Sequence, residues 1–180
     1  MQGRIRSMAL LHESLYRSGT FAGVDLAGYL KQLVTKAFRA QTTAPGTIQL
    51  QLDLASVHVE MDQAVPCGLL VNELLSNALK HGFPAGHPGT LRVDLQPVAG
   101  GPSWRLSVSD TGVGLPADFE ARRAQSLGLQ LVADLAGQLR GTLEIGPVPT
   151  GPGARFAVTL TPTATKPPAP ASVSPLTPPP

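Results

Sequence analysis

The chain has 180 residues, a formal net charge of +2 and only 14% charged residues. This length allows one ordinary globular domain with appendages, and the absence of Lys/Arg clusters gives no electrostatic case for nucleic-acid binding. A single cysteine, Cys67, permits neither an internal disulfide nor a cysteine metal cluster. No apolar run is long enough to indicate a membrane span, so we expect a cytoplasmic protein with no membrane segment.

Two helices are expected first along the chain. Residues 4–17 place apolar side chains three and four positions apart, which suits packing against another helix. His12 lies on that apolar line, and we interpret it as a packed structural residue rather than a catalytic one. Asp25 then precedes an amphipathic helix expected over residues 26–40 and is its expected N-cap.

Strand patterns account for much of the remaining chain. Alternating apolar and polar side chains predict strands over residues 47–53, 57–61, 91–95, 104–108, 141–145 and 154–160. In the second of these, Met61 is expected to face inward. Residues 117–125 form a short polar stretch that we interpret as a mobile cover. A helix is expected over residues 127–139, with Ser126 as its N-cap.

The most informative stretch is VNELLSNALKH, residues 71–81, within a helix expected from about residue 63. At about 100° per residue its apolar side chains gather on one broad arc, and Leu70 is the one apolar residue on the opposite side. A carboxylate, an amide, an ammonium group and an imidazole along one line suit a metal-bound phosphate, but an ordinary half-buried helix gives the same pattern. The four polar residues on that side are Glu73, Asn77, Lys80 and His81.

Two glycine-containing stretches follow. Asp110 ends a strand and is followed by Gly112 and Gly114, which allow positive φ and close approach of the backbone to a ligand. Alone, this pattern is a weak signal, because many strand-to-loop turns share it. Gly128 lies in the first turn of the helix after Ser126, where backbone N–H groups can meet phosphate oxygens.

In this order and spacing, the three stretches resemble the histidine kinase, Hsp90, gyrase and MutL-type ATP-binding fold. Residues 72–81 look like its N-box, residues 110–114 like its G1 box, and residues 126–129 like its G2 box. The similarity extends over about residues 4–160 to bacterial sensor histidine kinases of the HisKA_2/HWE-like type. It is carried by RIRSMALLHESLY, VDLAGYL, VNELLSNALKHGFP and SLGLQLV.

The resemblance implies an α+β fold of the Bergerat (HATPase) type, a two-layer α/β sandwich with a mixed sheet of about five strands and helices on one face. Residues 1–42 would be a helical remnant of the dimerisation and phosphoacceptor region, and residues 43–160 the ATP-binding catalytic domain. Residues 161–180 contain eight prolines and are expected to form a disordered tail. A homodimer through the N-terminal helices is expected.

The resemblance also implies site roles, with ATP and Mg²⁺ as cofactors. Asn77 would be a metal ligand, Glu73 would act on a water in the metal shell or assist the metal, and Asp110 would accept a hydrogen bond from the adenine amino group. Glu73, Asn77 and Lys80 are thus the expected catalytic residues. Either Arg122 or Arg123 is a candidate contact of the γ-phosphate. The further nucleotide-binding residues would be Lys80, His81, Gly112, Gly114, Gly128 and Leu129.

One part of the family pattern is missing. None of the four histidines stands in the phosphoacceptor context of a histidine followed by Arg and paired Asn, and the separate F-box is also absent. We therefore expect a histidine kinase catalytic domain that phosphorylates a histidine absent from this chain, either in a missing upstream region or on another chain. The expected partner is a response regulator or a separate phosphoacceptor domain. The alternatives are an ATPase or anti-sigma-type serine kinase on the same fold, and a degenerate interaction module.

Overall fold

The computed structural model describes residues 23–42, 47–84, 87–149 and 151–162. The helix expected over residues 4–17, with His12, lies outside the described residues, as does most of the expected tail. The elements in chain order are β1 (Val24–Asp25), α2 (Leu26–Gln41), β2 (Ile48–Leu54), β3 (His58–Val59), α3 (Met61–Asn77), the π-helical turn η1 (Ala78–Gly82), β4 (Gly89–Pro97), β5 (Trp104–Asp110), α4 (Phe119–Gln125), α5 (Leu127–Gln138), β6 (Thr142–Pro147) and β7 (Ala154–Leu160).

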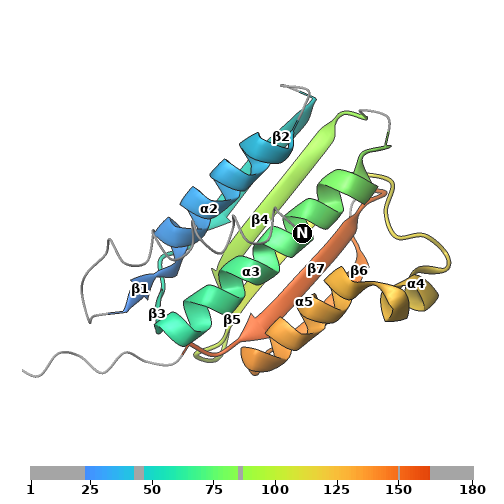
Figure 1. Cartoon of the computed structure of the whole chain (residues 1–180). Coiled ribbons are helices and arrows are strands. Elements are labelled where there is room, and N and C mark those ends of the chain that lie inside the picture. The colour runs from blue at the N-terminus through green and yellow to red at the C-terminus, as the bar shows by residue number, and fades with distance from the viewer. Residues whose placement is uncertain (1–22, 43–46, 85–86, 150, 163–180) are drawn as a thin grey trace, which may run out of the picture.

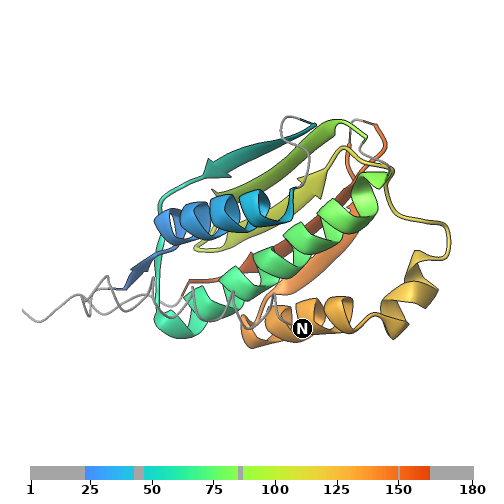
Figure 2. The same ribbon diagram turned by 45° about the horizontal axis from the view of Figure 1, so that its top comes forward.

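A five-stranded mixed sheet forms one of two layers, with strand order β2-β4-β5-β7-β6. β2 runs parallel to β4, and the other neighbouring strands are antiparallel. Helices α2, α3 and α5 lie side by side across one face of this sheet, as two views show (Figures 1 and 2). This arrangement confirms the expected two-layer α/β sandwich. The short strands β1 and β3 pair separately from the main sheet.

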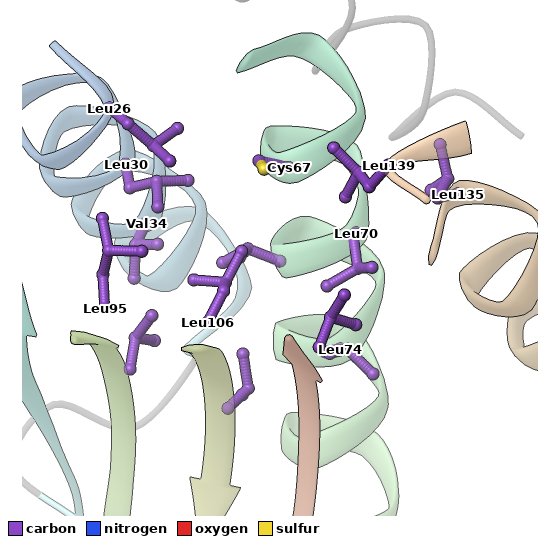
Figure 3. Packing of buried hydrophobic residues seen from close by; sticks show 14 of the residues in the cluster. Leu26, Leu30, Val34, Cys67, Leu70, Leu74, Leu95, Leu106, Leu135 and Leu139 are labelled. Atoms are coloured by element: carbon purple, nitrogen blue, oxygen red, sulfur yellow. The ribbon is translucent and has the colours of Figure 1, made fainter. Parts of the chain in front are cut away.

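The core lies between the sheet and the three helices. Alternation along β4 buries Leu91 and Leu95 and leaves Arg92 exposed, as expected for a sheet with one covered face. α3 occupies the centre of the helical layer. Figure 3 shows it between α2 and the end of α5, with leucine side chains from all three helices meeting above the strands. Each fully buried leucine contributes about 1.5–3 kcal/mol relative to an exposed one, so the leucines between helices and sheet contribute substantially to stability.

The polar side of α3 is more deeply buried than in an ordinary half-buried helix. Leu70, placed on the polar side by the sequence, is 0% exposed, and Glu73 on the same side is only 8% exposed. The physical reason is position: α3 lies on the sheet and has another helix on each flank, so three of its sides are covered (Figure 3). A helix enclosed in this way buries residues around most of its circumference.

Other differences lie at element ends. Met61 does not end a strand facing inward; it begins α3 and is 47% exposed, because Glu60 takes the N-cap position with extended backbone angles. Asp25 takes the N-cap position of α2, but its side chain makes no capping hydrogen bond. Residues 119–125 of the expected mobile cover form helix α4, which buries none of its residues. Within the described residues, no helix has the length and apolar character needed to cross a membrane.

Candidate functional site

The site is organised around Asp110, the last residue of β5. Its carboxyl group is 5% exposed, and Oδ1 accepts a hydrogen bond of 2.9 Å from the backbone N–H of Gly112. Burial raises the pKa of Asp110 above its ordinary value, while hydrogen bonds from the backbone of Gly112 and Ala154 oppose that rise. It forms no ion pair within the described part of the chain. Asp110 is thus a fixed, buried acceptor without a counter-cation.

Three glycines pack closely around this carboxyl group. A Cβ atom at Gly112 would overlap the carbonyl of Gly82, and one at Gly153 would overlap the carbonyl oxygen of Asp110. A Cβ at Gly82 would lie 3.1 Å from Oδ1 of Asp110. The backbone N–H of Val113 also donates to the Gly82 carbonyl at 2.9 Å. Close backbone contacts at Asp110 therefore connect three segments: the end of η1, the loop after β5 and the residue before β7.

The π-helical turn η1 changes the helix just beyond Asn77. Turns of this kind often mark functional sites, because they redirect side chains at the end of a regular helix. Asn77 is partly buried, and its Nδ2 atom is buried without a hydrogen-bond partner. Leaving a buried polar atom unpaired costs about 1–3 kcal/mol. Such an amide is suited to bind a ligand that satisfies it.

The other expected N-box residues differ in exposure. Glu73 is buried one turn before Asn77 on α3 and takes part in an interaction, so its carboxylate is held within the fold. Lys80 and His81 are exposed on η1, and neither forms a hydrogen bond or ion pair in the described ranges. The structure therefore places the expected N-box residues on one continuous helical segment, with the Glu73 side chain inside and the Lys80 and His81 side chains at the surface.

The start of α5 confirms the expected capping. The Ser126 hydroxyl accepts a hydrogen bond of 3.3 Å from the backbone N–H of Leu129. Gly128 is partly buried, while Leu127 beside it is 74% exposed. Gly114 has a φ of +79°, the left-handed conformation expected for it, but Gly112 is required for space rather than for positive φ.

Helix α4 lies between the β5 loop and α5 (Figure 1). Arg122 is 68% exposed and its Nε donates to Asp118 at 2.7 Å. Arg123 is 35% exposed, and a guanidinium nitrogen lies 3.7 Å from Glu120. The Phe119 ring meets the ring of Phe156 in β7 edge to face, with centroids 6.2 Å apart. This contact is the described link between α4 and the sheet.

The donor set fits a magnesium ion that is held chiefly by a ligand. No cluster of three or more His, Cys, Asp and Glu side chains able to hold a metal exists among the described residues. Mg²⁺ retains several waters and is commonly bound through one or two protein oxygens plus substrate phosphates. The amide oxygen of Asn77, with the carboxylate of buried Glu73 one turn earlier, matches that sparse pattern, while the unpaired Nδ2 of Asn77 is a donor suited to an anionic oxygen of the ligand.

Sequence reasoning did not identify Gly82 and Gly153 as part of the site. Gly82 directly follows residues 71–81, where a glycine is an ordinary helix terminator, and Gly153 lies in a Pro/Gly-rich loop like many others. Their role depends on contacts with residues up to 43 positions away, since Gly153 packs against Asp110. The π turn likewise has no distinguishing signal in the residues 78–82. The sequence shows that residues 119 and 156 are both phenylalanines, but it does not show that their rings are in contact.

Comparison with known proteins matches this geometry. Residues 62–164, more than half of the chain, match the family of histidine kinase-, DNA gyrase B- and HSP90-like ATPases. Residues 1–41 match a second family described as histidine kinase. The histidine kinase domain of the Erythrobacter litoralis EL346 blue-light-activated histidine kinase superposes with a TM-score of 0.75 at 26% identity, covering 87% of this chain and 72% of that one.

Relatives found by sequence are histidine kinases. Blue-light-activated histidine kinase 2 of Erythrobacter litoralis is 27% identical over 146 residues, 79% of this chain and 41% of that protein. Sensor histidine kinase PdtaS of Mycobacterium tuberculosis is 30% identical over 148 residues, 78% of this chain and 28% of that protein. The chain thus spans less than half the length of these relatives. It belongs to the family of histidine kinase-, DNA gyrase B- and HSP90-like ATPases and carries the ATP-binding catalytic domain of the histidine kinases.

Proposed function

We propose that this chain binds Mg²⁺–ATP at the Asp110 site and transfers the γ-phosphate to a histidine on a separate phosphoacceptor domain. The observation that carries the proposal is the buried Asp110 carboxyl group, held by backbone hydrogen bonds and lacking a counter-cation. A buried acceptor of this kind selects a ligand with an N–H group, because only a donor compensates its lost hydration. The exocyclic amino group of adenine supplies that donor.

The phosphate end of the nucleotide would lie toward η1 and the start of α5. Asn77 would hold Mg²⁺ through its amide oxygen, and Glu73 would orient a water beside it. Exposed Lys80 and His81 would bind phosphate oxygens, and the N–H groups near Gly128 and Leu129 add the positive end of the α5 dipole. Bound Mg²⁺ would neutralise phosphate charge and align the γ-phosphate.

Phosphoryl transfer depends mainly on positioning and charge stabilisation, which suits this arrangement. The chain's residues would bind, orient and enclose the nucleotide, while the accepting imidazole would come from the phosphoacceptor domain. A homodimer through residues 1–42 and a response regulator that receives the phosphoryl group complete the proposal. The division into a helical part over residues 1–42 and a catalytic domain over residues 43–160 belongs to it, with α2 packed against α3 in the shared core.

A second candidate is an ATPase or serine kinase that acts as a partner switch. The observation that favours it is the lack of a histidine in phosphoacceptor context in the chain. The two candidates share the nucleotide site and differ only in the acceptor. Radiolabelled phosphotransfer from ATP to a supplied dimerisation hairpin separates them, because only the histidine kinase gives an acid-labile, base-stable phosphohistidine.

The nucleotide site itself is tested by titration calorimetry of ATP and ADP, with and without Mg²⁺, into the full chain. Asp110→Asn should weaken the binding of both ATP and ADP by about 10- to 100-fold or more. The substitution replaces a carboxylate, which accepts a hydrogen bond from the ligand, by an amide. Asn77→Ala should remove the gain in affinity that Mg²⁺ provides and leave metal-free binding nearly unchanged.

Asp134→Asn is the matched control, since Asp134 is an exposed carboxylate on α5 without a described partner. It removes the same charge and should bind ATP as the unaltered chain does. If the unaltered chain binds no nucleotide, or Asp110→Asn binds as tightly as Asp134→Asn, the nucleotide-site proposal fails and the degenerate interaction module takes its place.

A further inference from the structure

The edge-to-face contact between Phe119 and Phe156 is one of two described points at which α4 meets the body of the domain. Helix α4 buries none of its residues, and both phenyl rings are only partly buried. The centroids lie 6.2 Å apart with an interplanar angle of 69°, within the range that favours aromatic pairs. At its other end α4 is held to α5 by a hydrogen bond of 2.8 Å from the Gln130 side chain to the Ala124 carbonyl. The aromatic contact therefore holds the first turn of α4.

Phe156 also lies close along the chain to the Asp110 site. Its strand β7 begins at Ala154, whose backbone bonds the Asp110 carboxyl group, and Phe156 lies two residues later on the same side of the strand. Phe156 is held in register between Val108 of β5 and Ile145 of β6. The ring that receives Phe119 is therefore fixed by the same strands that fix the buried acceptor.

Helical spacing links Phe119 to the arginines of α4. Arg122 and Arg123 follow it by three and four residues and are its neighbours on the helix surface. Arg122 is directed to Asp118 by a 2.7 Å contact and is 68% exposed, whereas Arg123 is 35% exposed and only 3.7 Å from Glu120. Of the two, Arg123 has the more covered guanidinium group and the weaker partner. Fixing Phe119 therefore also fixes the turn of α4 from which Arg123 extends.

We propose that Phe119 is a positioning residue that, through Phe156, holds α4 over the nucleotide site and brings Arg123 to the terminal phosphate. The inference rests on the proposed function, because the phosphate is that of bound ATP. Phe119 touches no nucleotide atom in this proposal. It acts on affinity for the triphosphate by reducing the number of arrangements that α4 samples before ATP binds.

The first arm of the test needs no nucleotide. Hydrogen exchange, measured by mass spectrometry on the full chain, reports opening of residues 117–126 in Phe119→Ala, Phe119→Tyr and the control Gln125→Ala. Gln125 is exposed on the same helix without a described partner. Loss of an aromatic pair should speed exchange in this segment about 2- to 10-fold. Phe119→Tyr keeps the ring edge and should exchange like the unaltered chain, as should Gln125→Ala.

The second arm separates positioning from general stability. Phe119→Ala should weaken ATP binding about 3- to 10-fold and change adenosine binding less than twofold, because adenosine uses Asp110 and lacks phosphates. A merely structural role would weaken both ligands equally. Phe156→Leu should have the effect of Phe119→Leu, and the double variant should be no worse than either single one, since each removes the same contact.

The outcomes are distinguishable from failure of the proposed function. Faster exchange in Phe119→Ala with an ATP-specific loss supports the proposal. Unchanged exchange, equal losses for ATP and adenosine, or additive effects of Phe119→Leu and Phe156→Leu overturn it even when the unaltered chain binds ATP. If the unaltered chain does not bind ATP, the nucleotide site fails first, and the exchange result then reports only whether the ring contact holds α4.

Discussion

Helix α3 leads into the candidate site at Asn77 and helix α4 follows the loop after Asp110, but the two helices are attached to the protein in opposite ways. α3 buries eleven of its 17 residues against the sheet and two other helices, whereas α4 buries none of its seven. Packed elements open only with a large part of the fold, while exposed ones move at little cost. Helix α3 is thus firmly held in the fold, whereas helix α4 is loosely held. Changes in α3 should alter folding, and changes in α4 should alter binding without altering folding.

The largest expected effect comes from Leu70→Ala in α3. Leu70 is 0% exposed, so the substitution leaves a cavity beside α5 and should lower the free energy of unfolding by about 2–5 kcal/mol. Urea unfolding followed by circular dichroism measures it. Leu127→Ala, at a leucine that is 74% exposed, is the matched control and should change stability by less than about 0.5 kcal/mol. Equal effects of the two substitutions would contradict the packing of α3.

The second prediction concerns Asp110, which lies beside Gly82 at the end of the helical segment formed by α3 and η1. Because burial raises the pKa of Asp110 in the folded state, the folded chain binds more protons than the unfolded chain between the two pKa values. The contribution of Asp110 to stability is therefore fully present below an unfolded pKa of about 3.9 and is lost as pH rises through the higher folded pKa. Each unit of pKa difference corresponds to about 1.4 kcal/mol.

Asp110→Asn removes this titration and provides the comparison. The free energy of unfolding of the variant minus that of the unaltered chain should increase as pH rises from the unfolded pKa of about 3.9 through the higher folded pKa, and then become constant. Urea unfolding at a series of pH values measures the difference. A difference that decreases over this range would show that the backbone hydrogen bonds, rather than burial, determine the pKa of Asp110.

A smaller effect is expected at the end of α5, which buries fewer residues than α3 and more than α4. Arg140 follows the helix with a φ of 50°, and the N–H of Gly141 bonds the Ala136 carbonyl as in a Schellman ending. Glycine tolerates this conformation, so Arg140→Gly should stabilise the chain by about 0.5–1 kcal/mol. Arg39→Gly, within the last turn of α2, is the control and should be destabilising. Thermal unfolding measures both, and a loss of stability in Arg140→Gly would refute the interpretation.

The smallest effect is expected in α4. Arg122→Ala removes an exposed ion pair with Asp118 on a helix that buries nothing, and pairs of this kind contribute little to stability. The midpoint of urea unfolding should remain unchanged within error. A clear decrease would show that α4 is held more firmly than its exposure indicates and would remove the contrast with α3.

Much of the fold and the candidate positions could be predicted from local patterns. The alternation of Ile48, Leu50 and Leu52 identified a half-buried strand, and the Ser126 cap was readable because its hydrogen bond spans three residues. The burial of Leu70 on the polar side of α3 could not be predicted, since periodicity reports one preferred face and α3 is covered on three sides. Roles of Asn77 and Asp110 in nucleotide binding remain predictions.

The sequence by itself determined most of the helices and strands and the order of the three polar and glycine-rich stretches, because these depend on spacing within a few residues. The two-layer class was implied by the resemblance to the family. Only the tertiary structure decided what meets at the site. Gly82 and Gly153 reach Asp110, and Phe119 reaches Phe156, across 28 to 43 positions of chain. Such contacts depend on strand order and on how closely backbones approach one another. Neither property is recorded in the local pattern of side chains.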